Sequence, residues 1–191
     1  TLTRSSAASD VYKRQVIPGQ DRRIALSLLD EDKTVWANSG TTIQDLGDGI
    51  LNLAFHTKMN TIGAEVIEGL NKVIDIAEGE PKWRGVVLSN EGGNFSAGAN
   101  VGMIFMLAVE QEWDELDHAI RMFQNTTMRL RYSGIPVVAA PHQLTLGGGC
   151  EVCLHVDKVV AHAESYIGLV EFGVGLILSL IHISEPTRPI D

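Results

Sequence analysis

Basic residues, long apolar runs and cysteines are all scarce in this 191-residue sequence. Fifteen Lys and Arg residues stand against 24 Asp and Glu residues, which gives a formal net charge of −9 at pH 7. No Lys/Arg stripe is present to neutralise phosphates, so we expect no nucleic-acid partner, although backbone groups could still hold a small phosphorylated ligand. The longest apolar run, Phe172 to Ile183, falls short of the ~20 residues that span a bilayer, so we expect no membrane partner.

The two cysteines, Cys150 and Cys153, stand in a C-x-x-C spacing. Such a spacing suits a redox pair or half of a zinc site, but no second Cys/His pair with zinc spacing accompanies it. We therefore predict no metal site and interpret both thiols as small, buried, apolar-like side chains on a helix. The lack of a disulfide framework favours a reducing compartment, and we expect a cytoplasmic protein.

The two ends of the chain differ in character from its middle. Residues 1–15 are rich in Ser and Arg, and they suit either a transit peptide or, as we favour, a non-native segment. Both this segment and residues 178–191 resemble the translated read-through of a sequencing adapter. Residues 16–46 are mixed in character, and we interpret them as a linker or the tail of an upstream module. The domain itself is expected over residues 47–177.

The middle of the sequence alternates short apolar runs with longer amphipathic stretches. Apolar positions three and four apart predict helices, whereas short apolar runs bounded by turn residues predict buried strands. The predicted strands are 50–55, 85–89, 136–140 and 156–161, and the predicted helices are 63–78, 110–131 and about 149–154. This order of elements predicts an α/β fold with largely buried strands.

Two glycine-rich loops each follow a predicted strand: residues 91–100, and the stretch Leu144–Cys153 with the sequence LTLGGGCEVC. Neither matches a phosphate-binding fingerprint, and each taken alone suits a connector that needs glycine for its geometry. Loops at the same ends of strands converge in a layered α/β fold, so one backbone N–H from each could meet at a single oxygen atom. Two donors placed in this way form an oxyanion hole.

Two carboxylates accompany these loops, Glu151 and Glu171. Glu151 stands on the first turn of a predicted helix, where an acid also stabilises the helix dipole, so the residues alone leave both roles open. Glu171 is flanked by Gly168-Leu169-Val170 and Phe172-Gly173-Val174. A lone carboxylate in such apolar surroundings suits general acid/base work near neutral pH. The two residues are the candidate catalytic pair.

Four motifs, in order and at a particular spacing, resemble those of a known family. They are Asn94–Asn100 (NFSAGAN), Pro136–Ala140 (PVVAA), Leu146–Glu151 (LGGGCE) and Gly168–Glu171 (GLVE). Together they resemble the enoyl-CoA hydratase (crotonase) family over about residues 47–177. The sequence is most similar to the hydratase module of bifunctional 3-hydroxyacyl-CoA dehydrogenase/enoyl-CoA hydratase proteins. In such proteins, residues 16–46 would be the tail of an upstream dehydrogenase part.

The resemblance implies a spiral of ββα repeats and a hydratase mechanism. The backbone N–H groups of Ala99 and Gly148 would form the oxyanion hole for a thioester carbonyl. Glu151 and Glu171 would hold one water molecule and add it syn across the C2–C3 double bond of a 2-enoyl-CoA, as in fatty-acid β-oxidation. Hydration would need no cofactor, because coenzyme A is part of the substrate, and NAD would enter only with an upstream dehydrogenase module.

The resemblance also implies residues that bind coenzyme A and an assembly. The coenzyme would meet the first glycine-rich loop, the turn before the predicted helix at 149 and one lysine: Ser96, Ala97, Gly98, Asn100, Gly147 and Lys58. The family often has Asp where Asn100 stands, which leaves the backbone role intact but alters the local charge. A homo-oligomer is the assembly that the family implies for the full-length protein.

Two other readings remain open from the sequence. An enoyl-CoA isomerase of the same fold usually needs only one carboxylate, whereas the presence of both Glu151 and Glu171 favours hydration. A non-catalytic acyl-CoA-binding fragment is the second alternative. The family continues after the second glutamate with a Pro/Gly-rich loop and helices that complete the acyl pocket and the trimer. The resemblance stops at Ile177, so we expect a C-terminally truncated form of the fold.

Overall fold

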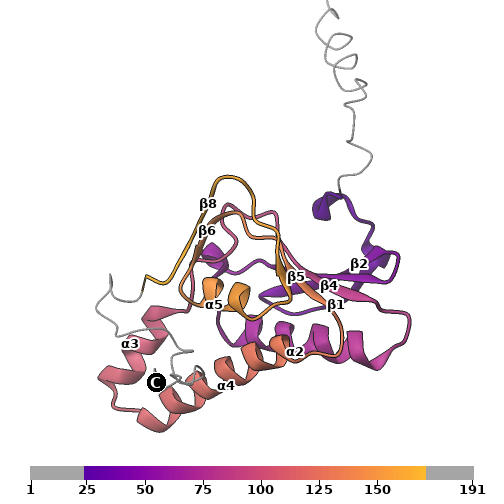
Figure 1. Cartoon of the computed structure of the whole chain (residues 1–191). Helices are drawn as coiled ribbons and strands as arrows, with labels where there is room; N and C mark the ends of the chain where they lie inside the picture. Colours follow the sequence, from indigo (N-terminus) through magenta and orange to yellow (C-terminus); the bar gives the residue numbers. More distant parts are fainter. Residues whose placement is uncertain (1–23, 171–191) are drawn as a thin grey trace, which may run out of the picture.

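The computed structural model describes residues 24–170, and Figure 1 shows them as a sheet with helices packed along one side. The predicted segments 1–15 and 178–191, together with Glu171, lie outside the described residues. Six strands form the main sheet in the order β1-β2-β3-β4-β5-β7, and β6 pairs separately with β8. The main-sheet strands are β1 (Thr34–Ala37), β2 (Thr41–Gly47), β3 (Ile50–Phe55), β4 (Gly85–Leu88), β5 (Val137–Ala139) and β7 (Lys158–Val159).

The second, smaller sheet and the helices complete the described part of the chain. The paired strands are β6 (Gln143–Leu146) and β8 (Ser165–Gly168). The α-helices are α2 (Ala64–Gly79), α3 (Val101–Val109), α4 (Trp113–Arg131) and α5 (Gly148–Leu154). Three single-turn 3₁₀ helices lie at η2 (Leu26–Leu28), η3 (Glu31–Lys33) and η4 (Lys58–Asn60).

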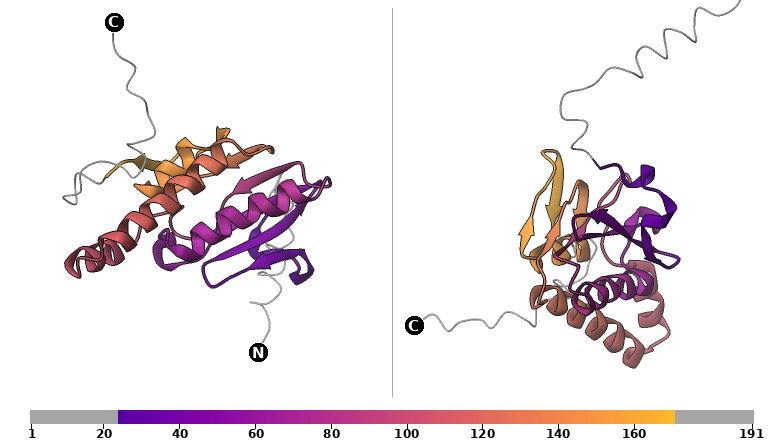
Figure 2. Two further views of the ribbon diagram at one scale, coloured as in Figure 1. Left: turned by 90° about the horizontal axis from the view of Figure 1, so that it is seen from below. Right: turned by 90° about the vertical axis from the view of Figure 1, so that its right-hand side faces the viewer.

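Strand direction divides the main sheet into two parts. β1, β2 and β3 are antiparallel, whereas β3, β4, β5 and β7 run parallel to one another. Parallel neighbours need a crossover connection, and α2 supplies it between β3 and β4 while α3 and α4 supply it between β4 and β5. As a result α2 and α4 lie side by side, as Figure 2 shows from below. The predicted α/β class is confirmed.

Most of the predicted elements are present at the predicted places. β3 spans 50–55 as predicted, β4 and β5 fall within the predicted strands, and α2, α4 and α5 correspond to the three predicted helices. The predicted strand over 156–161 is reduced to the two exposed residues of β7. Helix α3, strands β6 and β8, and the antiparallel strands β1 and β2 were not predicted from the sequence.

The sheet begins before residue 47, inside the range interpreted as a linker or the tail of an upstream module. β1 pairs with β2, and β2 pairs with β3 along its length. The turn between β2 and β3 contains Gly47, Asp48 and Gly49 at φ of 91°, 52° and 77°, a backbone conformation that glycine and aspartate tolerate. Ile43 on β2 is fully buried. Residues 34–37 and 41–46 are therefore part of strands of this sheet.

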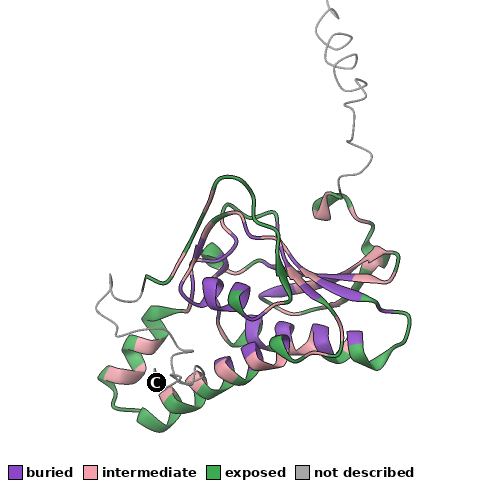
Figure 3. Ribbon diagram, viewed as in Figure 1, coloured by how far each residue is buried: buried purple, intermediate pink, exposed green. Residues whose placement is uncertain are grey.

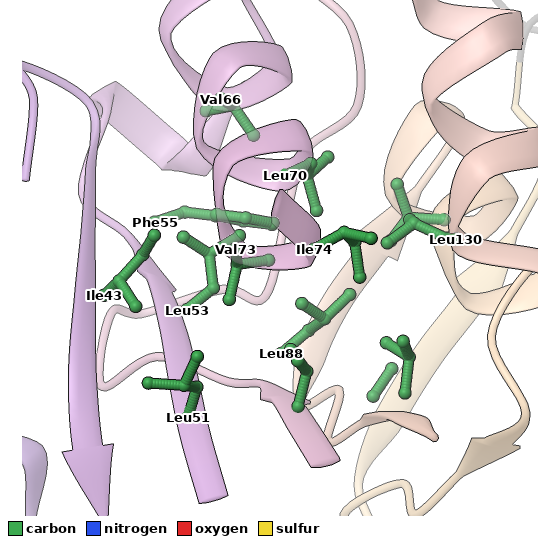
Figure 4. Packing of buried hydrophobic residues seen from close by; sticks show 14 of the residues in the cluster. Ile43, Leu51, Leu53, Phe55, Val66, Leu70, Val73, Ile74, Leu88 and Leu130 are labelled. Carbon is green, nitrogen blue, oxygen red and sulfur yellow. The ribbon is translucent and has the colours of Figure 1, made fainter. Parts of the chain in front are cut away.

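The hydrophobic core lies between the sheet and the helices, and Figure 3 shows the buried positions on the faces that meet there. Helix α2 contributes side chains three and four positions apart, because such positions share one face of a helix: Val66, Leu70, Val73 and Ile74. Figure 4 shows them packed against side chains of β2, β3 and β4, namely Ile43, Leu51, Leu53 and Leu88.

Helix α4 buries less of its apolar face than its sequence pattern predicts. The spacing of its apolar residues in the sequence predicts one face made of Trp113, Leu116, Ile120, Phe123, Thr127 and Leu130. Only the last three of these are buried, whereas Trp113 is 58% exposed. Leu116 and Ile120 instead line a cavity between α4 and its neighbours.

Gly69 marks the closest approach of α2 to β2. A Cβ at this position would lie 2.3 Å from Oγ1 and 2.9 Å from Cβ of Thr41. In an exposed helix alanine is favoured over glycine by ~0.8–1.0 kcal/mol. Here we expect Gly69→Ala to lower the free energy of unfolding by about 1–3 kcal/mol instead, because helix and strand must move apart. Urea unfolding followed by circular dichroism measures the change.

The matched control for this prediction is Gly79→Ala at the other end of α2. A Cβ at Gly79 would meet nothing within 4 Å, so only the higher helix propensity of alanine affects the stability of this variant. We expect it to keep or raise the free energy of unfolding. If Gly69→Ala proved as stable as Gly79→Ala, the close packing of α2 on β2 would be wrong.

Candidate active site

The glycine-rich loop before α3 is held on both sides by backbone hydrogen bonds. On one side the N–H of Ser96 donates to the carbonyl of Leu144 (3.1 Å), and the N–H of Leu146 donates to the carbonyl of Ser96 (2.9 Å). On the other side the N–H of Ile62 donates to the carbonyl of Gly98 (2.8 Å). The loop therefore lies between the start of α2 and β6, the strand that leads into the second glycine-rich stretch.

The N–H groups of Ala99 and Gly148 lie close together where the two stretches meet. Ile62 bonds to the carbonyl of Gly98 and accepts from the N–H of Asn100 (3.4 Å). Because N–H groups alternate in direction along an extended segment, the N–H of Ala99 points away from Ile62. A Cβ built on Gly148 would lie 3.4 Å from the nitrogen of Ala99, and one built on Gly98 would lie 3.4 Å from the nitrogen of Gly148.

The two N–H groups have no acceptor among the described residues. Gly148 is the first residue of α5, and the first N–H groups of a helix have no partner within it. Within residues 24–170, neither the N–H of Ala99 nor that of Gly148 donates a hydrogen bond. The structure thus brings together two backbone N–H groups from separate motifs, and their role as oxyanion-hole donors stays a prediction.

Three glycines make this close approach of two backbones feasible. Gly98 and Gly147 have φ of 92° and 49°, in the left-handed region that side chains disfavour. A Cβ on Gly149 would lie 2.7 Å from Cβ of Ser96, so only glycine lets the start of α5 rest against the loop. Gly98, Gly147 and Gly149 therefore serve turn geometry and close packing.

Glu151 lies on the first turn of α5 and is fully buried. Its backbone N–H donates to the carbonyl of Gly147 (2.9 Å), and its own carbonyl is 2.8 Å from Nδ1 of His155. Residues three apart share one side of a helix, so Glu151 stands on the same side of α5 as Gly148. A buried carboxylate is thus carried on the same short helix as the N–H of Gly148, one of the two N–H groups that meet here.

Glu171, the second predicted carboxylate, lies outside the described residues. The chain that leads toward it is described as far as residue 170. β8 runs parallel to β6, and the N–H of Gly147 donates to the carbonyl of Gly168 (2.9 Å). The last described strand thus ends beside the glycine-rich turn, three residues before Glu171.

The residues predicted to bind coenzyme A differ in their access to a ligand. Ser96 is fully buried, and its Oγ accepts from the N–H of Gly98 (3.1 Å), so its side chain shapes the loop. Gly98 and Gly147 are buried as well, whereas Ala97 is half-buried. Lys58 and Asn100 are exposed. The Oδ1 of Asn100 accepts from the N–H of Met103 (3.2 Å), and Asn100 thereby caps α3.

An apolar cavity that is partly open to solvent lies beside Ala99. It is enclosed by the start of α2, the start of α3 and the first half of α4. Its walls are Ile62, Gly63, Ala64, Ile67, Ala99, Asn100, Met103, Ile104, Leu116, Ala119, Ile120, Met122 and Phe123. The sequence reading missed this cavity because it did not predict α3. The apolar face predicted for α4, which includes Leu116 and Ile120, was the signal that pointed to it.

Both cysteines are buried thiols on α5, as predicted. Burial, and next the neighbouring Cys150, raise the pKa of the Cys153 thiol to about 12. Since the thiolate is the reactive form, we expect Cys153 to resist a thiol reagent at pH 8 in the folded protein and to react after denaturation. Counting thiols with Ellman's reagent with and without guanidinium measures this. Rapid labelling of Cys153 in the folded protein would show that α5 is not packed as described.

Two searches of residues 24–170 bear on metal ions and membranes. Within them, no group of three or more His, Cys, Asp or Glu side chains is placed to hold a metal ion. Over the same residues, every helix is too short or too polar to cross a membrane.

Comparison with solved structures identifies the fold class. A crystal structure of an enoyl-CoA hydratase from Polaromonas sp. JS666 superposes with a TM-score of 0.68 at 24% sequence identity, covering 76% of this chain and 59% of that one. At this identity the likeness concerns the fold alone. The described part of the chain thus has the crotonase-like α/β fold that the resemblance implied.

Sequence comparison then establishes the family. The family described as enoyl-CoA hydratase/isomerase matches residues 45–183, and the chain belongs to it. A Bacillus subtilis protein named "Probable 3-hydroxyacyl-CoA dehydrogenase" is 47% identical over 157 residues, which cover 82% of this chain and 20% of that protein. A Rickettsia felis protein named as a fatty acid oxidation complex trifunctional enzyme is 31% identical over 150 residues, which cover 78% of this chain and 20% of that protein. The chain therefore spans about a fifth of the length of these relatives.

Proposed function

We propose that this chain is the enoyl-CoA hydratase module of a larger fatty-acid oxidation enzyme, adding water syn across the C2–C3 double bond of a 2-enoyl-CoA. The observation that carries the proposal is the approach of two N–H groups, those of Ala99 and Gly148, which have no acceptor among the described residues and lie at the edge of an apolar cavity. The two N–H groups would recognise a carbonyl oxygen, and the cavity would hold an acyl chain.

The proposed chemistry follows from where charge develops. Attack of water at C3 places negative charge on the thioester oxygen, and this enolate needs donors that are already oriented. Ala99 and Gly148 would supply two such donors, and losing one donor of this kind typically raises the barrier by ~2.7–4 kcal/mol. The cavity would bury the acyl chain and exclude water from all but the reacting end.

Proton transfer in this proposal belongs to Glu151 and Glu171. One carboxylate would accept a proton from the attacking water, and the other acid would deliver a proton to C2. Glu151 is buried on the helix that carries the Gly148 donor, which supports its part. For Glu171 the support is indirect: the strand that precedes it ends at the hydrogen bond between Gly147 and Gly168.

The proposal extends to the protein that contains this chain. A relative named as a 3-hydroxyacyl-CoA dehydrogenase matches the chain over only a fifth of its own length, which supports a dehydrogenase module in the same polypeptide. Hydration itself would need no cofactor, and NAD would serve that second module. The 3-hydroxyacyl product of hydration is the substrate such a dehydrogenase would oxidise. We propose a cytoplasmic, homo-oligomeric enzyme.

The experiment that tests the proposed function uses the complete product of the gene with crotonyl-CoA. Hydration removes the conjugated double bond, so we expect the absorbance of the enoyl thioester to fall. Conversion of a 3-enoyl-CoA to a 2-enoyl-CoA without hydration would instead support the isomerase. Binding of both thioesters with neither reaction would leave an acyl-CoA-binding protein, and the hydratase proposal would be wrong.

A further inference from the structure

The cavity beside Ala99 has a definite direction. At one end, Ile62, Ala99 and Phe123 all come within 3.5 Å of a Cβ built on Gly148, so this end adjoins the two N–H donors. From Phe123 the wall of the cavity follows α4 away from the donors, past Ile120 and Ala119 to Leu116. These residues share one face of α4, because they are spaced three and four positions apart.

The length of this wall sets a scale for what the cavity can hold. Leu116 and Phe123 are seven residues apart, which corresponds to about 10 Å along an α-helix. An extended backbone advances ~3.3–3.6 Å for every three bonds, or roughly 1.2 Å per bond. An alkyl chain that starts at the Phe123 end could therefore run for about eight bonds before it reaches Leu116.

The chemistry of the walls restricts the chain to a hydrocarbon. Within residues 24–170, Asn100 is the one lining residue whose side chain carries an amide, hydroxyl or charged group, and its Oδ1 already accepts from the N–H of Met103. Among the described residues, no charged side chain contributes to the lining. An acyl group that carries a hydroxyl or carboxylate would lose its hydration here without an equivalent partner. The cavity thus suits an unsubstituted aliphatic chain.

Ala119 is the narrowest side chain that α4 presents to the cavity. It lies four residues from Phe123 and three from Leu116, and its neighbours in the wall, Leu116 and Ile120, are both bulky. Four residues correspond to about 6 Å along the helix, or about five bonds of an extended chain. A large side chain at position 119 would therefore obstruct the cavity partway along its length.

We propose that Ala119 determines the acyl chain length, and that its small side chain admits unsubstituted aliphatic 2-enoyl chains of about eight to ten carbons. The inference rests on the proposed function for the identity of the ligand as an acyl-CoA. Its own basis is the position of Ala119 between the donor end and the far end of the cavity.

The test is Ala119→Leu, which keeps a strong helix former but adds three carbons to the cavity wall. Each methylene that enters an apolar site changes kcat/KM by about fourfold. We expect kcat/KM for 2-decenoyl-CoA to fall about 10²-fold, because about four methylenes lose their place, and kcat/KM for crotonyl-CoA to stay within about threefold. An equal fall for both substrates, or no fall for either, would overturn the proposal.

A binding measurement distinguishes failure of this inference from failure of the hydratase proposal. In calorimetric titrations we expect wild-type protein to bind decanoyl-CoA more tightly than butyryl-CoA, and Ala119→Leu to lose that difference. Loss of the difference without any hydration would uphold the role of Ala119 and refute the hydratase. Hydration of both enoyl-CoA substrates with an unchanged binding difference would uphold the hydratase and refute the role of Ala119.

Two further variants guard against a folding artefact. His118→Leu places the same side chain on an exposed position of α4 outside the cavity, and it should keep the wild-type ratio of kcat/KM between the two chain lengths. Ala119→Met fills the cavity with an unbranched, adaptable side chain and should reduce the ratio less than leucine does. If His118→Leu altered chain-length preference as much as Ala119→Leu, the cavity would not be responsible.

Discussion

Replacing Glu151 by glutamine is expected to lower kcat for crotonyl-CoA hydration by about 10²–10⁴-fold while KM changes little, because general acid/base catalysis contributes on that scale. Glutamine keeps the shape and volume of this fully buried side chain. Its amide, however, cannot accept a proton from water and return it. Initial rates over a range of substrate concentrations separate kcat from KM.

The same variant distinguishes the two roles that the sequence alone left open for Glu151. If the carboxylate only stabilised the dipole of α5, its loss would lower the free energy of unfolding by ~0.3–1 kcal/mol and leave kcat unchanged. Glu164→Gln is the matched control, since it alters an exposed carboxylate between β7 and β8 and should keep wild-type kcat. Wild-type kcat in Glu151→Gln would contradict the proposed mechanism.

The parts of the fold that could be predicted are those whose apolar pattern is regular and buried. Helix α2 is the clearest case, since it buries one face built from positions three and four apart. β3 and β4 are short apolar runs, and most of their residues are buried, so the run itself indicated a strand. In these elements local pattern and tertiary packing agree.

The elements that were missed lack such a pattern. Helix α3 has the sequence VGMIFMLAV, which is apolar on every side, so it shows no helical periodicity, and none of its residues is buried. β6 and β8 are four residues each, and their partner is a strand about 20 residues away in the sequence. β7 is held to the sheet by β5, and both of its residues are exposed. These strands are defined by their pairing with another strand, and a short stretch of sequence does not indicate that pairing.

For the candidate site, the sequence could predict which residues meet but not how. The motifs containing Ala99 and Gly148 were expected to converge, and the structure brings them together. The side chain of Ser96 is buried against Gly149 and accepts a hydrogen bond from the N–H of Gly98, while its expected contact with the ligand stays a prediction. A short loop of small residues reveals that two backbones must approach closely. It does not reveal which of its members supports the loop and which faces the ligand.

Gly148→Pro is expected to lower kcat for hydration by about 10²–10³-fold, because it removes one of the two N–H donors. Gly148 is the first residue of α5, the helix position at which proline is best tolerated because its N–H has no partner within the helix. The preceding residue is Gly147, which has no Cβ to collide with the proline ring. The fold should therefore persist, and thermal unfolding followed by circular dichroism checks that it does.

Gly148→Ala is the comparison that isolates the N–H itself. Its added Cβ would make ordinary contacts of 3.4–3.5 Å with the nitrogen of Ala99, Cζ of Phe123 and Cδ1 of Ile62, and the N–H would remain. We expect this variant to lose no more than about tenfold in kcat, or roughly 1.4 kcal/mol of transition-state stabilisation. Equal rates for the proline and alanine variants would mean that the N–H of Gly148 contributes nothing, and the charge on the thioester oxygen would then need another donor. A much slower proline variant with a wild-type unfolding temperature would support the N–H of Gly148 as a donor in the transition state.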